Sequence, residues 1–254
     1  MKSGEKNCGV YHKRQGRLHS PSTMKNRGAL ITFEGLDGCG KSTQLEKLAA
    51  ALRKQGLEVI ATREPGGTAM GERIREILLN SRTSGLAPLA ELALMFAARA
   101  QHVEEVILPA LAAGKLVLSD RFTDSSEAYQ GGGRQLGSEV IMDLHRRLCR
   151  NLQPRLTILM DSDVAASVAR ARRRNRTQQR DGHGADETRF EQEDRRFFER
   201  VRAAYLAIAQ REPDRVAVID ARRPIATVHR EIFATVQERL QLGAPEAARQ
   251  GARR

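Results

Sequence analysis

Five short runs of apolar residues recur along the chain, and each is followed by a longer stretch with helical periodicity. The runs span 29–34, 57–63, 116–120, 156–161 and 216–220. Each has the length of a buried strand, and strands that alternate with helices form parallel sheets covered on both faces. The pattern therefore predicts an α/β fold with three layers, in which helices cover both sides of a five-stranded parallel sheet.

Helical patterns fill the intervals between these runs. We expect helices over 42–55, 71–80, 89–113, 138–150, 164–174, 192–210 and 225–240. Gly56 directly follows the first of them, at a position where glycine commonly ends a helix.

The length suits one domain. With 254 residues, 40% of them hydrophobic, the chain can bury one sizeable core. We expect a single domain over 28–242. The basic extension 1–27 and the tail 243–254 have the polar composition of disordered segments, and Met24 offers an alternative start residue within the extension.

The sequence contains no candidate membrane span or secretory signal. The best apolar stretch, 86–98, is interrupted by Pro88 and Glu91, whereas a span needs about 20 apolar residues. The extension lacks the apolar middle of a signal peptide. An odd number of widely spaced cysteines favours neither a disulfide framework nor paired zinc ligands, and the three are Cys8, Cys39 and Cys149. We therefore expect a cytoplasmic protein in a reducing compartment.

The formal net charge of +12 allows two interpretations. It is typical of nucleic-acid binding, but it also suits small anionic substrates. The charge is concentrated in the extension and in a run of arginines from Arg170 to Arg180. Aromatic residues make up only 4% of the chain and tryptophan is absent, so the stacking platforms of single-strand binders are not evident.

A glycine-rich segment after the first apolar run matches the phosphate-binding loop pattern G-x-x-x-x-G-K-[ST]. Its residues are Gly35, Leu36, Asp37, Gly38, Cys39, Gly40, Lys41 and Ser42. The segment follows a predicted strand and opens a predicted helix, so backbone N–H groups and the helix dipole can converge on a polyphosphate. The sequence thus predicts a P-loop NTPase fold that binds ATP or GTP.

Two side chains at the end of this loop carry the chemistry. Lys41 places a positive charge at the β- and γ-phosphates, and the hydroxyl of Ser42 is suited to coordinate Mg²⁺. Thr43 is a secondary candidate for the same nucleotide contact. Switches, motors and small-molecule kinases all use such a loop, so further motifs must choose between them.

Two other strand ends carry charged residues, where ligand contacts collect in open parallel sheets. Arg63, in the segment 62–68 (TREPGGT), is a candidate to grip an acceptor phosphate, or else it is a solvated residue beside a turn. Asp120 ends the third run and is a candidate for the Mg²⁺ shell, although an acid here can also simply cap a turn. Arg121 follows it and is a candidate contact to the transferred phosphates.

At four segments the sequence resembles the thymidylate kinases of bacterial type, and the resemblance extends over 29–240. The segments are 33–38 (FEGLDG), 62–68 (TREPGGT), 120–122 (DRF) and 128–134 (AYQGGGR). The resemblance implies a phosphotransferase that uses ATP and Mg²⁺ to convert dTMP to dTDP in dTTP biosynthesis. It also implies a homodimer with an α-helical interface.

The resemblance further implies roles for residues around the acceptor. Asp37 is expected to reach the 3′-hydroxyl of the sugar, which explains an acid in a loop that attracts phosphate. Arg63 and Arg121 are expected to bind the acceptor phosphate. The residues matching the segment that lines sugar and base are Ser125, Ser126, Tyr129 and Gln130, of which Tyr129 is placed to exclude a 2′-hydroxyl.

For the base, the family uses an aromatic face that stacks on thymine and an arginine one helical turn later. Arg99 matches the arginine. The family spacing of four residues falls on Met95, whereas the nearest aromatic residue is Phe96, three residues before Arg99. Both spacings share a helix face. We expect Phe96 to be the stacking ring, with Met95 and an ordinary core role for Phe96 as the alternatives.

The segment 168–190 corresponds to the lid that closes over the phosphates in this family. The phosphate loop has no arginine, so the lid is expected to supply the one that stabilises the transferred group. Our candidates are Arg170, Arg174 and Arg189, while a solvated basic helix end is the alternative for such residues. Glu191 is a candidate contact to the metal or its water shell.

Two other functions stay open on sequence grounds. A kinase for another nucleoside monophosphate would share Lys41, Ser42 and Asp120, but it would not need the pairs Tyr129–Gln130 and Phe96–Arg99. A nucleic-acid-binding ATPase would use the same loop and the positive charge, and its hydrolysis would rise with added DNA or RNA and depend steeply on salt.

Overall fold

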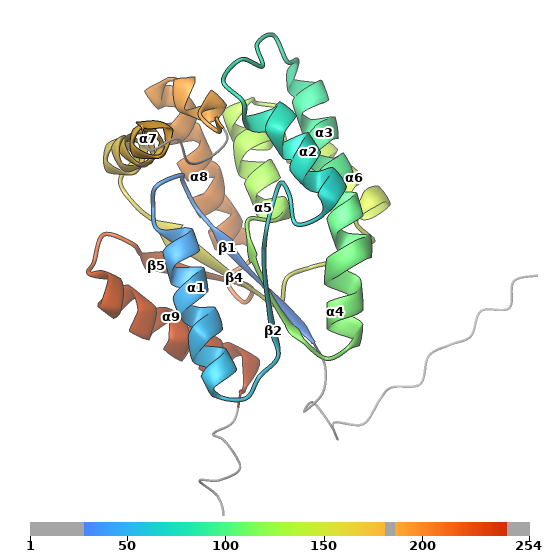
Figure 1. Cartoon of the computed structure of the whole chain (residues 1–254), viewed down its shortest axis with the longest axis vertical. Helices are drawn as coiled ribbons and strands as arrows, with labels where there is room; N and C mark the ends of the chain where they lie inside the picture. The colour runs from blue at the N-terminus through green and yellow to red at the C-terminus, as the bar shows by residue number, and fades with distance from the viewer. Residues whose placement is uncertain (1–27, 181–185, 243–254) are drawn as a thin grey trace, which may run out of the picture.

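The computed structural model describes residues 28–180 and 186–242 (Figure 1). Its strands are β1 (Ala29–Glu34), β2 (Val59–Arg63), β3 (Leu116–Asp120), β4 (Leu156–Asp161) and β5 (Val216–Asp220). Four of the five have the predicted bounds, and β2 begins two residues later than predicted. The expectations for 1–27 and 243–254 lie outside the described residues.

The strands form one parallel sheet in the order β2-β3-β1-β4-β5, which confirms the predicted α/β fold. After β1 the chain passes to β2 on one side of the sheet, and after β4 it passes to β5 on the other side. The loops that follow the neighbouring strands β1 and β4 therefore run in opposite directions. Such a reversal leaves a ligand-binding crevice at the carboxyl edge of the sheet. In the register of the sheet, Asp120 pairs with Phe33 on one side and with Arg63 on the other.

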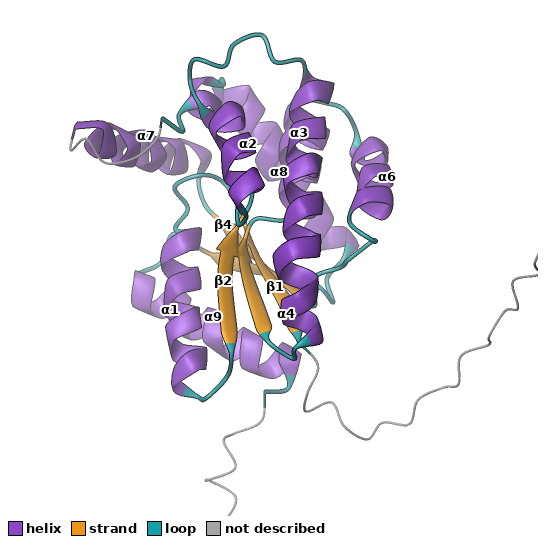
Figure 2. Cartoon of the chain, turned by 45° about the vertical axis from the view of Figure 1, so that its right-hand side comes forward, coloured by secondary structure: helices purple, strands orange, loops and turns teal. Residues whose placement is uncertain are grey.

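Both faces of the sheet are buried, because successive side chains of each strand point to opposite sides. From β1, Ile31 and Phe33 pack in a core with α1 (Lys41–Lys54) and α9 (Ile225–Leu240). Leu30 packs on the other side with α3 (Pro88–His102) and α6 (Ser138–Leu148). Figure 2 shows α1 and α9 below the carboxyl edge and α2, α3 and α6 rising beyond it.

The remaining helices complete the outer layers. They are α2 (Ala69–Leu79), the π-helix η2 (Val103–Ile107), α4 (Leu108–Ala112), α5 (Thr123–Ser126), the π-helix η3 (Glu127–Gly133), α7 (Val164–Arg180), the 3₁₀ turn η4 (Arg189–Gln192) and α8 (Arg195–Arg211). The helix predicted over 89–113 is thus built of α3, η2 and α4. The sequence did not predict a helix over α5 and η3.

The predicted lid contains the outer part of α7, which extends past its predicted end to Arg180, and the segment that returns through η4. Residues 181–185 of the lid lie outside the described part of the chain. None of the helices within residues 28–180 and 186–242 is long and apolar enough to cross a membrane.

Candidate active site

The glycine-rich loop curls around the start of α1. Gly35, Gly38 and Gly40 all have positive φ angles, of 131°, 79° and 100°, which glycine adopts without strain. A Cβ at Gly38 would also lie 2.2 Å from the carbonyl oxygen of Ser167, so α7 packs directly on the loop. Lys41 is buried, and its Nζ donates to the carbonyl oxygens of Gly35 (3.1 Å) and Leu36 (2.9 Å).

Oxygen ligands for a cation meet beside this loop. Ser42 Oγ donates to Asp120 Oδ2 over 2.6 Å, so the two residues expected at the metal are in contact. The described residues include no cluster of three or more His, Cys, Asp or Glu side chains that could hold a metal ion by itself. Mg²⁺ keeps several waters and is commonly held by one or two protein oxygens together with substrate phosphates, so Ser42 and Asp120 fit that ion.

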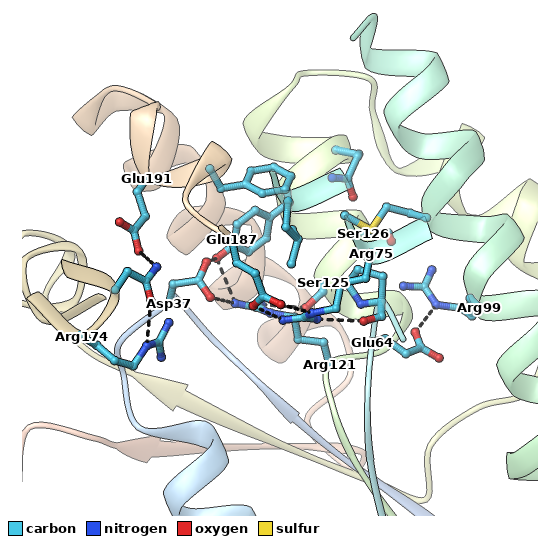
Figure 3. A pocket seen from close by; sticks show the side chains of 17 residues that line it. Asp37, Glu64, Arg75, Arg99, Arg121, Ser125, Ser126, Arg174, Glu187 and Glu191 are labelled. Carbon is cyan, nitrogen blue, oxygen red and sulfur yellow. Dashed lines mark hydrogen bonds and ion pairs between the residues drawn. The ribbon is translucent and has the colours of Figure 1, made fainter. Parts of the chain in front are cut away.

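A pocket of about 720 Å³, including the space at its mouth, opens next to the loop (Figure 3). Its walls come from the phosphate loop, the segments that follow β2 and β3, the helices α2, α3, α5 and η3, and the lid. The lining residues are Asp37, Glu64, Pro65, Arg75, Leu79, Met95, Arg99, Arg121, Ser125, Ser126, Tyr129, Gln130, Arg174, Asn175, Glu187, Phe190 and Glu191. A pocket that combines apolar walls with a few convergent charges is typical of a small-molecule site.

Asp37 and Arg121 form the charged floor between loop and pocket. Arg121 Nη2 lies 2.6 Å from Asp37 Oδ1, and the hydroxyl of Tyr129 donates to Asp37 Oδ2 over 2.9 Å. Burial opposes ionisation of Asp37, but the charges of Arg121 and Lys41 lower the pKa of its carboxyl below the ordinary value. Asp37 therefore stays ionised, and each of its carboxylate oxygens accepts a hydrogen bond, one from Arg121 and one from Tyr129.

Arg121 has an unusual backbone conformation, and its guanidinium also contacts a cluster of hydroxyl groups. Its φ angle is 74°, in the left-handed region that is uncommon for arginine. Its Nη1 donates to Ser125 Oγ (3.0 Å) and to Tyr205 Oη (3.2 Å), and both hydroxyls donate in turn to Glu34 Oε2. Burial and the charge of Asp124 raise the pKa of Glu34 to about 7.

The base-recognition residues do not all lie where the sequence predicted. Arg99 lines the pocket, but Phe96 has no exposed surface and packs under Arg99, whose guanidinium carbon is 4.8 Å from the ring centroid. Met95 lines the pocket instead. The two positions differ by one residue, which turns the side chain about a quarter of the way around the helix. This placement corrects the expectation that Phe96 offers a stacking face.

Ser125, Ser126, Tyr129 and Gln130, the residues expected to line sugar and base, line this pocket together. They come from α5 and η3. Gln130 Nε2 donates to Glu91 Oε1 over 2.9 Å, and Ser126 Oγ is buried without a hydrogen-bond partner among the described residues. An unpartnered buried hydroxyl inside a pocket is available to a ligand.

The cation on the α2 side of the pocket is Arg75, not Arg63. Arg63 forms an exposed ion pair with Glu72 (2.9 Å) and does not line the pocket, which differs from the expectation that it binds the acceptor phosphate. Arg75 Nε and Nη2 bind both carboxylate oxygens of Glu187, at 2.7 and 2.6 Å. Arg75 shares a helix face with Leu79, four residues on, but the sequence offered no means of preferring it to Arg73.

The three candidate arginines of the lid have different surroundings. Arg174 lines the pocket and donates to Asn175 Oδ1 (3.2 Å). Arg170 Nε donates to the carbonyl oxygen of Gly38 in the phosphate loop (2.8 Å). Arg189 does not line the pocket. It is buried against Glu91 (2.8 Å) and the carbonyl of Leu78, which corrects the expectation that it faces the phosphates.

Glu191 lines the pocket on the side of the lid. It is not part of the contact between Ser42 and Asp120. Its carboxylate accepts from Asn175 Nδ2. Burial and the charge of Asp37 raise the pKa of Glu191 above its ordinary value.

Comparisons with known proteins agree on one family. The family model described as thymidylate kinase matches residues 33–232. The chain is 51% identical over 207 residues to the thymidylate kinase of Pseudomonas entomophila, covering 82% of this chain and 94% of that protein. It is 50% identical over 194 residues to the thymidylate kinase of Desulfovibrio desulfuricans, covering 76% and 88%.

A solved structure gives the same result. The crystal structure of thymidylate kinase from Ehrlichia chaffeensis superposes with a TM-score of 0.65 at 32% identity, covering 83% of this chain and 99% of that one. The similarity therefore extends over the sheet, its helices and the pocket between them.

Proposed function

The chain belongs to the thymidylate kinase family, and we infer from this that it transfers the γ-phosphoryl group of ATP to dTMP, forming dTDP and ADP. The assignment of the site rests on one contact: the ion pair of Asp37 and Arg121 joins the phosphate loop to the neighbouring pocket. The two substrates would meet there, one on each side of this ion pair.

ATP is assigned to the loop side. The triphosphate would lie along 35–43, with its oxygens on backbone N–H groups at the start of α1. In the described structure Lys41 Nζ rests on loop carbonyls, from which it can reach the β- and γ-phosphates. Arg170, bound to Gly38 on the lid side of the loop, would contribute positive charge.

The acceptor is assigned to the pocket. Its phosphate would lie between Arg121 and Arg75, so the role expected of Arg63 passes to Arg75. Its 3′-hydroxyl would bind Asp37, and Tyr129, which contacts Asp37 through its hydroxyl, would exclude a 2′-hydroxyl from the space beside the sugar. The dTMP phosphate would have to displace Glu187 from Arg75, because both ligands are anions that match the guanidinium fork.

The base would lie at the far end of the pocket. Arg99 Nη1, buried and without a partner in the described structure, would donate to a carbonyl oxygen of thymine. Met95 would contact the base through its polarisable thioether, in place of the stacking ring expected of Phe96. Ser125, Ser126 and Gln130 complete the walls.

Phosphoryl transfer requires positioning and charge neutralisation more than covalent chemistry. Lys41 and Arg121 would stabilise the transferred group from either side, and Arg174 would approach it from the lid. Mg²⁺, held by Ser42 and Asp120 together with the phosphates, supplies charge neutralisation when bound. Glu191 would contact only the water around it.

The test of this assignment is ADP release by the purified protein with dTMP and Mg-ATP. Lys41→Ala should lower kcat by about a thousandfold or more without a large change in Tm. Ser42→Ala and Asp120→Asn should raise the Mg²⁺ concentration needed for half-maximal rate. Normal activity of Lys41→Ala at a normal Tm would contradict the assignment.

We also propose that the enzyme works as a cytoplasmic homodimer. Three large apolar side chains are about half exposed on α2 and at the start of α3: Met70, Ile77 and Leu89. Such side chains on adjacent helices suit a helical interface. Cys39 and Cys149 are free thiols, as expected in a reducing compartment. Light scattering of Ile77→Asp should show a monomer if these helices form the interface.

A further inference from the structure

The guanidinium of Arg99 is fixed at two of its three nitrogens. Arg99 Nε lies 2.6 Å from Glu64 Oε2, and Nη2 donates to the carbonyl oxygen of Phe122 over 3.0 Å. The third nitrogen, Nη1, is buried without a hydrogen-bond partner among the described residues. Since Arg99 lines the pocket, the direction of Nη1 decides what it can donate to.

Glu64 divides its two oxygens between Arg99 and His102. His102 Nδ1 lies 2.8 Å from Glu64 Oε1, and His102 Nε2 lies 2.7 Å from Thr62 Oγ1. An ionised carboxylate can only accept, so Nδ1–H donates to it, and in the neutral ring Nε2 accepts from the hydroxyl of Thr62. Glu64 thereby fixes the tautomer of His102, and the hydroxyl of Thr62 holds the other ring nitrogen in place.

The carboxylate in the middle of this chain is ionised although it is buried. Burial alone would raise the pKa of Glu64, but the charge of Arg99 and the hydrogen bond from His102 lower it below the ordinary value. The side chains of Arg99 and Glu64 are each 3% exposed and that of His102 is fully buried. Losing one partner of a buried charge is costly, because the other is left uncompensated.

His102 controls how Arg99 binds Glu64. An arginine and a carboxylate prefer a two-pronged contact through two parallel hydrogen bonds. Here His102 occupies Oε1, which leaves a single carboxylate oxygen for Arg99. Without the hydrogen bond from His102, both oxygens of Glu64 could accept from Arg99, one from Nε and one from a second nitrogen. The guanidinium would then turn away from the carbonyl of Phe122.

The surrounding backbone keeps the histidine ring in place. His102 lies three residues after Arg99 on α3, so both side chains share one helix face. A Cβ at Gly67 would lie 2.6 Å from both Cδ2 and Nε2 of the ring. The turn after β2 therefore packs closely against the ring, at a residue where φ is 78°.

We propose that His102 is a positioning residue for base recognition: through Glu64 it directs Arg99 Nη1 at the nucleobase of the acceptor. The ring itself does not line the pocket. The proposal rests on the assignment of Arg99 to the base, and it adds that the selectivity of this contact depends on a side chain that no substrate touches.

The test separates KM for dTMP from KM for ATP and from kcat. His102→Leu should raise KM for dTMP about tenfold, the loss expected when a charged hydrogen bond is misdirected, with KM for ATP and kcat within about twofold. His102→Asn, whose amide nitrogen can replace Nδ1 as donor, should restore most of the loss. His229→Leu is the control, because His229 lies on α9 beside Phe233 and does not line the pocket, so it should leave both KM values within about twofold.

A double mutant identifies the route of the effect. In the Arg99→Gln background, His102→Leu should add no further rise in KM for dTMP, because both changes remove the same contact. Additive effects, or equal changes in the KM of dTMP and ATP, would overturn the proposal. If Arg99→Gln alone left KM for dTMP unchanged, the assignment of Arg99 would fail instead.

If His102→Leu does not fold, Thr62→Val tests the same chain of contacts, since valine keeps the shape of threonine and removes only the hydroxyl that holds Nε2 of His102 in place. We expect about a threefold rise in KM for dTMP with KM for ATP unchanged. A normally folded Thr62→Val protein with unchanged KM for dTMP would likewise overturn the proposal.

Discussion

Arg121 Nη2 lies 2.6 Å from Asp37 Oδ1, so the residue after β3 is tied directly to the phosphate loop after β1. The pair places a positive and a negative group at the boundary between the ATP loop and the acceptor pocket. In the proposed assignment, a phosphate approaching from either side would meet Arg121, while a hydroxyl would meet Asp37. One ion pair would thus hold the acceptor in line with the donor, which is the main requirement of phosphoryl transfer.

The first prediction concerns Met95 and Phe96. Met95→Ala should raise KM for dTMP about five- to tenfold through lost apolar contact, with Tm almost unchanged because Met95 is only partly buried. Phe96→Leu should instead lower Tm by several degrees, since the ring is fully buried. Calorimetry and steady-state kinetics on both variants distinguish the two roles. An unchanged KM for dTMP in Met95→Ala would show that the base contacts another wall of the pocket.

The arginines before and within α2 give a second prediction. Arg75→Gln should raise KM for dTMP at least about tenfold, because it removes a charged partner of the acceptor phosphate. Arg63→Gln should change it less than about twofold, because Arg63 is exposed and pairs with Glu72 at the surface. Kinetics at a fixed ATP concentration compare the two variants. A larger rise in KM for dTMP in Arg63→Gln than in Arg75→Gln would show that the Arg63 side chain rotates into the site.

The lid arginines give a third prediction. Arg174→Gln should lower kcat about a hundredfold or more with little change in Tm, as expected for a group that stabilises transferred charge. Arg189→Gln should mainly lower Tm, because it removes one charged partner of the fully buried Glu91, which keeps Arg134, and costs about 1.5–3 kcal/mol. A selective fall in kcat for Arg189→Gln at constant Tm would reverse these roles.

Glu34 gives a prediction about pH. Its pKa is raised from 4.5 to about 7 in the folded protein, so the folded state binds more protons than the unfolded state between these values. The stability from this group is fully present below about pH 4.5 and is lost as the pH rises through about 7. Urea unfolding at pH 5 and pH 8 should show that Glu34→Gln, which carries no charge at either pH, gains stability relative to the unmodified protein at pH 8. A constant difference between the two proteins would contradict the shift.

The strands were predictable because each is a short apolar run that ends at a polar residue. The run 116–120 ends at Asp120, as β3 does. The helix over α5 and η3 was not predictable, since it ends in three consecutive glycines with poor helix propensity. Packing explains them: a Cβ at Gly132 would lie 2.7 Å from Ala204 Cβ, and one at Gly133 would lie 2.6 Å from the Phe197 ring. Close contact with α8 therefore selects a helix that local sequence disfavours.

The site was predictable where a motif fixes the position of a residue within a loop. Lys41, Ser42 and Asp120 lie together as their motifs implied. The choice between Met95 and Phe96 was not, because one residue along a helix turns a side chain from pocket to core, and both are apolar. Glu64 and His102 also escaped prediction, since a buried histidine is recognised as part of a site only by the side chains it contacts.

The most direct test of the central claim is ADP release by the purified protein with Mg-ATP and each of dTMP, dUMP, UMP, CMP and dGMP as acceptor, repeated with Arg99→Gln. We expect a clear preference for dTMP, with UMP disfavoured by Tyr129, and a rise in KM for dTMP but not for ATP in the variant. Release with another acceptor only, or release that does not depend on any acceptor, would contradict it.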